Sequence, residues 1–136
     1  MVKEILVEGY EEYVKAAAEN KGKQVFALFS GSKDANGESW CPDCLTADPV
    51  IKDNLKYAPA DAILIHCGVG KREFWKDKEN VFRKDPKLLL KCVPTLLKLG
   101  TVTSTTNRHR FCQQPQRLEE AQCADENLVQ MFFEED

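Results

Sequence analysis

Short apolar runs recur along this chain, with polar segments between them. Residues 24–29 and 62–67 are apolar at almost every position, which is typical of strands that are buried on both faces. Residues 5–7 indicate a shorter strand, and residues 94–99 indicate another that opens on a proline. An edge strand is expected within residues 117–122. The pattern therefore predicts a sheet whose central strands have no solvent-facing side.

Helical spacing of apolar residues occurs between and after these runs. It indicates a helix over residues 10–20, a longer helix over residues 42–57 and a final helix around residues 127–132. Pro49 lies inside the second helix, where a proline removes one hydrogen bond and is expected to kink the chain. Residues 74–82 indicate a loop and a short helix. The alternation of strands and helices predicts an α/β fold, with a central mixed β-sheet flanked by helices on both faces.

The composition fits one soluble domain that spans residues 1–136. The formal net charge of −3 gives no reason to expect a nucleic-acid partner. No apolar run approaches the length needed to cross a membrane, and the N-terminal residues do not resemble a secretory signal. We therefore expect a cytoplasmic protein that needs neither a nucleic acid nor a membrane, and we expect it to be a monomer.

Six cysteines are spread along the chain, and in the cytoplasm most of them should be reduced thiols. Cys41 and Cys44 form a C-x-x-C pair, which can close a small disulfide or contribute half of a zinc site. A zinc site needs two further ligands, usually a second closely spaced pair, and the sequence contains no such pair. We therefore expect redox chemistry at this pair and no metal.

Of the other four cysteines, three are favoured as structural residues. Cys67 ends a predicted buried strand and Cys123 precedes the final helix, so both should behave as small apolar side chains. Cys92 is also a candidate secondary redox site, because it lies just before the proline at residue 94, although a structural role is favoured. Cys112 falls in a polar stretch and is expected to be exposed and oxidisable.

The residues around the cysteine pair favour a disulfide-exchange site. Pro42 suits the first turn of a helix, where its missing N–H would have no partner in any case. Cys41 would then lie at the helix N-terminus, where backbone N–H groups and the helix dipole stabilise a thiolate. Cys44 lies on the same face, placed to attack a mixed disulfide formed at Cys41. The sequence therefore predicts Cys41 as the nucleophile and Cys44 as the resolving thiol.

Asp43 is expected to tune this pair together with Pro42. A carboxylate early in a helix interacts favourably with the dipole, but it also repels a thiolate at Cys41. Because the two effects oppose each other, we expect a reducing protein rather than a strongly oxidising one. The alternative, that Asp43 is only a favourable early-helix residue, has nearly equal support.

The order of strand, loop, Trp-Cys-x-x-Cys and helix, followed downstream by Val93-Pro94-Thr95, resembles the thioredoxin superfamily. Further segments resemble, more narrowly, the family of thioredoxin domain-containing protein 17. These are residues 31–34 (GSKD), 39–44 (SWCPDC), 74–77 (FWKD), 82–84 (FRK) and 93–98 (VPTLLK). The resemblance covers roughly residues 1–100 and 115–136. The stretch at about 102–114 departs from it and is interpreted as a loop insertion.

The resemblance implies a cytosolic disulfide reductase with no bound cofactor, which receives electrons from NADPH through thioredoxin reductase. It implies small or peptide disulfides as substrates, and links to peroxide removal and to TNF/NF-κB signalling. A different class of function stays open: a redox-gated binding module, in which the dithiol switches affinity for a signalling protein and turnover is incidental.

Four residues are expected to contact the substrate. Trp40 should cover one side of the dithiol, and Ser39 belongs to a long loop that either narrows access or is only a solvated turn. The resemblance implies that Pro94 is cis and lies against the cysteines, which leaves the backbone of Val93 free to pair with an extended substrate. From the residues alone, Pro94 is equally suited to begin a strand.

A buried acid that the resemblance would imply is missing from this chain. In thioredoxins a carboxylate on the strand before the motif accepts a proton, whereas residues 25–29 contain no acid here. Proton transfer is therefore expected to use Asp43, water or another group.

Overall fold

The computed structural model of the protein describes residues 3–20, 24–33, 36–58, 61–85, 88, 90–99 and 117–134. The expected insertion at about 102–114, and with it Cys112, lies outside the described residues. Among the helices of the described part of the chain, none has the length and apolar character needed to cross a bilayer.

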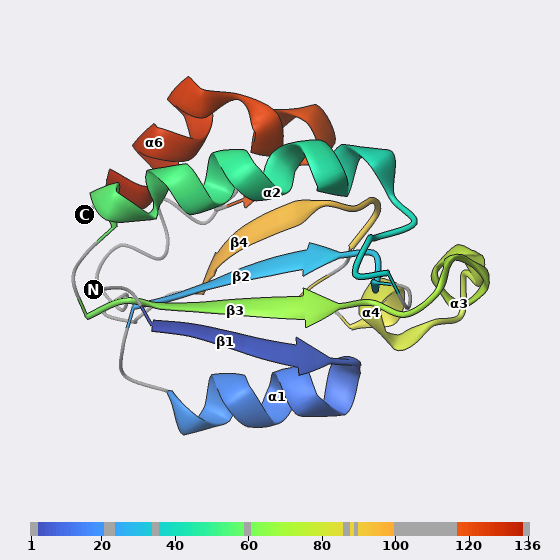
Figure 1. The fold of residues 1–136 in the computed structure, drawn as a ribbon. Coiled ribbons are helices and arrows are strands. Elements are labelled where there is room, and N and C mark those ends of the chain that lie inside the picture. Colours follow the sequence, from blue (N-terminus) through green and yellow to red (C-terminus); the bar gives the residue numbers. More distant parts are fainter. Residues whose placement is uncertain are drawn as a thin grey trace, which may run out of the picture.

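Five strands of the described residues form one mixed sheet, as the apolar runs predict (Figure 1). Its order is β1 (Lys3–Glu8), β3 (Ile63–Gly68), β2 (Val25–Ser30), β4 (Thr95–Leu99) and β5 (Arg117–Glu119). β3 pairs in parallel with both β1 and β2, whereas β4 runs antiparallel to β2, and β5 antiparallel to β4. The parallel strands place their carboxyl ends at one edge of the sheet, where the cysteine motif follows β2.

Helices cover both faces of the sheet (Figure 1). Helix α1 (Tyr10–Glu19) packs below β1 and β3, and α2 (Pro42–Asn54) and α6 (Glu126–Glu134) lie together on the opposite face. Two short helices, α3 (Arg72–Lys76) and α4 (Val81–Lys84), follow β3 beyond the carboxyl edge. The predicted α/β fold with a central mixed sheet is confirmed.

Two expected elements end earlier than predicted. The helix expected over residues 42–57 ends at Asn54, and the chain continues as the 3-10 turn η1 (Leu55–Tyr57). The edge strand expected over residues 117–122 ends at Glu119. There Glu120 adopts a positive φ of 50°, and the 3-10 segment η3 (Glu120–Ala124) begins with a capping box. Because a left-handed residue cannot continue a strand, this turn shortens β5.

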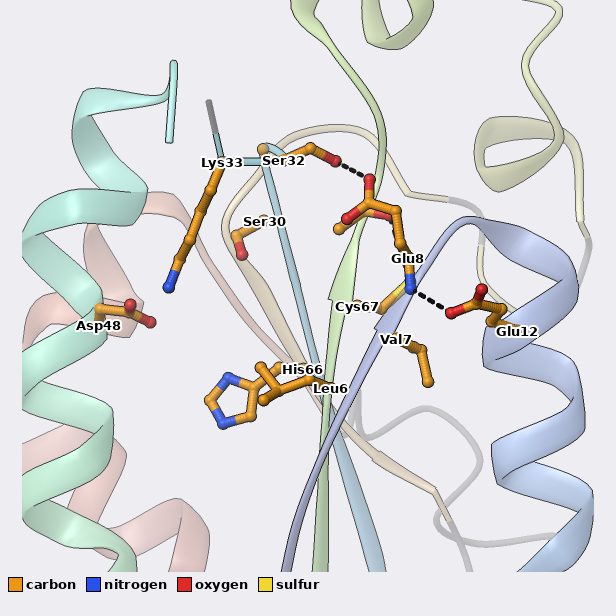
Figure 2. Close-up of a pocket in the computed structure, with 12 residues that line it drawn as sticks. Leu6, Val7, Glu8, Glu12, Ser30, Ser32, Lys33, Asp48, His66 and Cys67 are labelled. Carbon is orange, nitrogen blue, oxygen red and sulfur yellow. Dashed lines mark hydrogen bonds between the residues drawn. The ribbon is translucent and has the colours of Figure 1, made fainter. Parts of the chain in front are cut away.

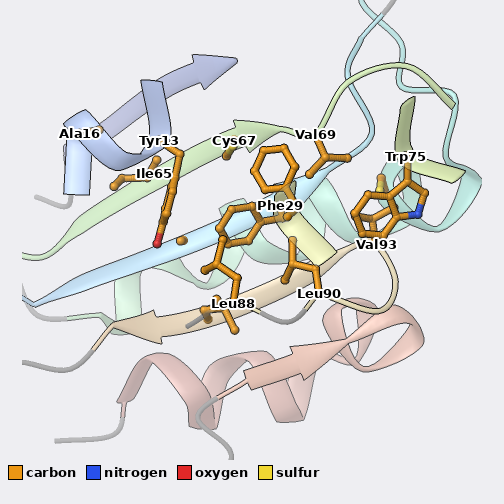
Figure 3. Close-up of a cluster of buried hydrophobic side chains, with 14 of the residues drawn as sticks. Tyr13, Ala16, Phe29, Ile65, Cys67, Val69, Trp75, Leu88, Leu90 and Val93 are labelled. Atoms are coloured by element: carbon orange, nitrogen blue, oxygen red, sulfur yellow. The ribbon is translucent and has the colours of Figure 1, made fainter. Parts of the chain in front are cut away.

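The apolar run of β2 is buried on both faces because its side chains alternate between two cores. Phe26 and Leu28 face α2 and α6, where Phe26 meets the ring of Phe133 edge to face at 4.9 Å between centroids. Phe29 faces the other core, which α1, α3 and α4 complete, and Figure 3 shows it beside Tyr13. The sheet that carries the motif is therefore anchored from both sides.

Edge strand β1 is covered on one face only. Its inward residues Ile5 and Val7 pack against the α1 core, whereas Leu6 is 76% exposed. Glu4, on the same face as Leu6, is hydrogen-bonded to His66 of β3, at 2.9 Å between Oε1 and Nε2. Helix α2 therefore leaves part of this sheet face open.

Candidate active site

Cys41 caps the N-terminus of α2. Its backbone is extended, with φ −98° and ψ 111°, and its sulfur accepts a hydrogen bond from the Cys44 N–H at 3.2 Å. Pro42 occupies the first helical turn, which is the position expected from the sequence. The helix N-terminus therefore directs a backbone donor at the Cys41 sulfur, and such a donor stabilises a thiolate.

Cys44 lies beneath Cys41 as a buried free thiol. The two residues are 3% and 4% exposed respectively, and no disulfide joins them. Burial raises the pKa of the Cys44 thiol well above its ordinary value, and a hydrogen bond with Cys41 adds to the rise. Hydrogen bonds from the Gly31 backbone and the Ser39 hydroxyl act in the opposite direction. Burial therefore favours the protonated form of Cys44, and its role as the resolving thiol stays a prediction.

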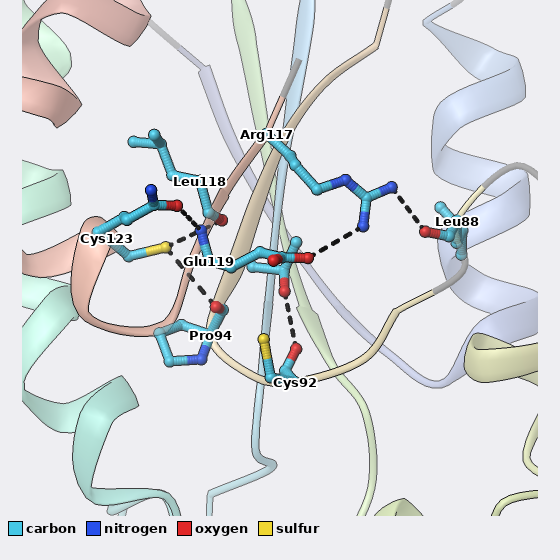
Figure 4. Close-up of polar contacts among 9 residues, drawn as sticks. Leu88, Cys92, Pro94, Arg117, Leu118, Glu119 and Cys123 are labelled. Atoms are coloured by element: carbon cyan, nitrogen blue, oxygen red, sulfur yellow. Dashed lines mark hydrogen bonds and ion pairs between the residues drawn. The ribbon is translucent and has the colours of Figure 1, made fainter. Parts of the chain in front are cut away.

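The loop before β4 closes over the cysteine pair. The Val93–Pro94 peptide bond is cis, so this expectation is confirmed, and Cys41 Sγ lies 3.6 Å from the Val93 carbonyl oxygen. The Pro94 carbonyl accepts hydrogen bonds from the Glu120 N–H at 2.8 Å and from Cys123 Sγ at 3.7 Å. Figure 4 shows the Cys123 contact holding this loop against η3. The loop is therefore fixed from behind while its front faces Cys41.

Trp40 and Ser39 flank the pair. The Trp40 Nε1–H donates to the Gly70 carbonyl at 2.8 Å, and the Arg72 guanidinium lies 5.8 Å from the ring centroid. Ser39 Oγ accepts a hydrogen bond from the Cys41 N–H at 3.1 Å. Both residues are half-buried, which agrees with the expected position of Trp40 beside the dithiol. Contact of either residue with a substrate stays a prediction.

Glycine at position 31 permits this close packing. A Cβ there would lie 2.6 Å from Trp40 Cε2 and 2.8 Å from Ser39 Oγ, so no larger residue fits without displacing them. Sequence reasoning did not assign Gly31 or Gly70 to the site, because their roles depend on contacts between segments distant in sequence. Asp48, four residues after Cys44 on α2, lines a pocket next to the motif.

Asp43 lies in the first turn of α2 with its side chain exposed to solvent. It is therefore placed to interact with the helix dipole, while its influence on the redox potential stays a prediction.

The pair Phe74-Trp75 is divided between surface and core. Trp75 is buried with the Arg83 guanidinium 4.4 Å from its ring centroid, whereas Phe74 is 45% exposed.

The other described cysteines are also free thiols. Cys67 and Cys123 are buried, as expected, and burial raises the pKa of each thiol to about 12. Cys92 is half-buried, and its pKa is raised by burial and then by the charges of Glu119 and Glu120. Among the described residues, no group of three His, Cys, Asp or Glu side chains is arranged to hold a metal ion.

The reduced protein is expected to lose stability as the pH rises above about 9. Cys67 and Cys123 ionise near pH 12 when folded, whereas a thiol in the unfolded chain ionises near about 8.5. Between these two pH values the unfolded chain binds fewer protons than the folded protein. Each buried thiol therefore lowers the free energy of unfolding by about 1.4 kcal/mol for every unit by which the pH rises. Urea denaturation under reducing conditions at several pH values measures the slope.

Cys67→Ala provides the control for this alkaline effect. Removing the thiol should make the decline less steep by the contribution of one group, while the stability below the thiol pKa of the unfolded chain changes only by the lost packing. An unchanged slope in Cys67→Ala would show that its ionisation is not responsible.

Comparison with known proteins agrees with this architecture. Residues 6–135 match the model of a family described as thioredoxin domain-containing protein 17-like, thioredoxin domain. The thioredoxin domain-containing protein 17 of Mus musculus is 47% identical over 133 residues, which cover 98% of this chain and 96% of that protein. The Homo sapiens protein of the same name is 45% identical over the same shares of each chain. This chain therefore belongs to the thioredoxin domain-containing protein 17 family, and its cysteine pair lies at a helix N-terminus that a cis-proline loop faces.

Proposed function

We propose that the protein is a disulfide reductase that acts by dithiol–disulfide exchange. The observation that carries this proposal is the position of Cys41, whose sulfur caps a helix N-terminus and faces the Val93 carbonyl. A thiolate stabilised in this way attacks one sulfur of a substrate disulfide, forms a mixed disulfide and releases the first substrate thiol. Cys44 then attacks Cys41 and releases the second substrate thiol, which leaves a Cys41–Cys44 disulfide.

Small or peptide disulfides are the substrates that this site suits best. Cys41 is only 4% exposed, and Trp40 is held beside it by its hydrogen bond to the Gly70 carbonyl. A large folded protein would have to displace these fixed groups before its disulfide reached the Cys41 sulfur. An extended peptide could instead lie along the Val93–Pro94 loop, where Val93 is the backbone partner that we propose.

The cycle needs an external reductant to return the disulfide to the dithiol. We propose that thioredoxin reductase supplies it with electrons from NADPH, and that the protein works in the cytoplasm as a monomer. In this setting the reductase could support peroxide removal and act on a protein of TNF/NF-κB signalling. The family assignment supports these proposals through the resemblance discussed above.

The proposed activity is tested by NADPH consumption with purified thioredoxin reductase and cystine or a short peptide disulfide. The wild-type protein should consume NADPH in proportion to its concentration, and Cys41→Ser should show only background. Cys92→Ser is the matched control, because it removes a half-buried thiol outside the motif and should retain turnover. Equal rates for wild type and Cys41→Ser would refute the proposal.

A further inference from the structure

A polar pocket of about 290 Å³ lies beside α2, at the carboxyl ends of β1, β3 and β2 (Figure 2). It opens where α2 leaves the face of edge strand β1 uncovered, next to the exposed Leu6. Its volume is sufficient for several water molecules, and hydroxyl, carboxylate, amine and imidazole groups line it. The functional residues described above do not account for this pocket.

Two residues connect the pocket to the resolving thiol. Gly31 lines it, and the Gly31 backbone forms a hydrogen bond with the Cys44 sulfur. Asp48 lines it from α2, four residues after Cys44 and therefore one turn further along the same face of the helix. Residues at this spacing have Cβ atoms about 5–6 Å apart. Cys44 and Asp48 are thus neighbours on one face of α2, and Asp48 is the one that lines the pocket.

The strand before the motif and Asp43 are poorly placed to accept the Cys44 proton. Leu28 and its neighbours on β2 are buried and apolar, so the strand before the motif supplies no acid. Asp43 is exposed to solvent, whereas Cys44 is buried. Because the resolving thiol must lose its proton before it can attack, that proton passes to water or to another group.

Among the carboxylates of the pocket, Asp48 is the one placed for this role. Glu8 accepts a hydrogen bond from the Ser32 hydroxyl, and Glu12 accepts one from the Glu8 N–H at 2.9 Å. Both belong to the β1–α1 side of the pocket, away from the helix that carries the cysteines. Asp48 alone of the three shares that helix with Cys44.

Other charged or titratable groups lie near Asp48 in the pocket. Figure 2 shows the Lys33 amine turned toward Asp48, and His66 of β3 lies below them. His66 is hydrogen-bonded to Glu4, and Glu8 accepts a hydrogen bond from the Ser32 hydroxyl, so both acids already have partners. A carboxylate in such a pocket can serve as a general base when it reaches the proton directly or through one water molecule.

We propose that Asp48 accepts the Cys44 proton, through water in this pocket, in the step that resolves the mixed disulfide; this inference rests on the proposed function. The proton passes from Cys44 to the Asp48 carboxylate. The Cys44 thiolate forms a bond to the Cys41 sulfur, and the bond between Cys41 and the substrate sulfur breaks. The electron pair leaves on the substrate thiolate, which is reduced, and the enzyme dithiol is oxidised to the disulfide. Asp48 later returns its proton to the substrate thiolate or to solvent.

A single-turnover experiment with an aromatic nitrobenzoate disulfide separates the two steps, because each step releases one coloured thiolate. In Asp48→Asn the first release should keep the wild-type rate, while the second should slow by about tenfold or more. Asp53→Asn is the matched control, since Asp53 is exposed and lies on the opposite side of the same helix. The control should show both phases at wild-type rates.

Three further readouts distinguish proton transfer from a structural role. Asp48→Glu should recover most of the second-phase rate, and acetate should accelerate that phase in Asp48→Ala, a variant that also preserves helix propensity if Asp48→Asn folds poorly. The defect should shrink as the pH rises through the alkaline range, because hydroxide then removes the Cys44 proton directly. A structural defect would slow both phases and would not respond to acetate or pH.

The outcomes also separate this inference from the proposed function. An unchanged second phase in both Asp48→Asn and Asp48→Ala would overturn the role of Asp48 and leave the reductase intact. An equal slowing of both phases would overturn it as well. Absence of coloured thiolate release from the wild-type protein would instead refute the proposed function itself.

Discussion

Serine in place of Cys44 is expected to stop the proposed reaction at the mixed disulfide. Cys41 keeps its position at the helix N-terminus, so it should still attack the substrate, but no second thiol can displace the product. NADPH-linked turnover should fall to the level of Cys41→Ser. Mass spectrometry of the intact protein should show one substrate half attached to Cys41, and a reducing agent should release it.

The control for this trap is Cys92→Ser, which keeps both motif cysteines and should show neither trapping nor loss of turnover. A variant with serine at both Cys41 and Cys44 tests the alternative of a redox-gated binding module. A reductase loses every captured species in that variant, whereas a binding module keeps its partner. Wild-type turnover in Cys44→Ser would contradict a two-thiol mechanism.

Alanine in place of Phe29 is expected to lower the free energy of unfolding by about 3–5 kcal/mol. Phe29 is fully buried in central strand β2, and its ring lies 5.0 Å from that of Tyr13 and 5.9 Å from that of Phe82. Truncation removes these contacts and leaves a cavity between the sheet and α1, which neighbouring side chains cannot easily fill. Urea denaturation of the reduced protein measures the loss.

Phe74→Ala is the matched control, because it removes the same side chain from a site that is 45% exposed. Its cost should stay at about 1 kcal/mol or less. Equal destabilisation by the two substitutions would show that the Phe29 core does not dominate the stability of the sheet. Since Phe29 lies two residues before Gly31, its loss should also reduce turnover by disturbing the packing of Trp40.

The sequence-based predictions were most accurate where a single local rule decided the structure. The apolar run that contains β2 is buried on both faces, and Pro42 begins α2 with Cys41 as its cap, as predicted. They were less accurate at the ends of elements. The strand expected over residues 117–122 stops at Glu119, because hydrogen bonds from Glu120 and Cys123 to the Pro94 carbonyl tie the turn to a distant loop.

The sequence alone determined the α/β fold, the position of the cysteine pair at a helix start and the absence of an acid on the strand before it. These properties follow from periodicity, helix capping and residue identity, which act over a few neighbouring residues. Only the tertiary structure decided that Gly31 must be glycine beneath Trp40, that Cys44 is buried and that Asp48 shares a pocket with Lys33 and His66. Those contacts join segments far apart in the chain, so they exist only once the sheet and helices have packed together.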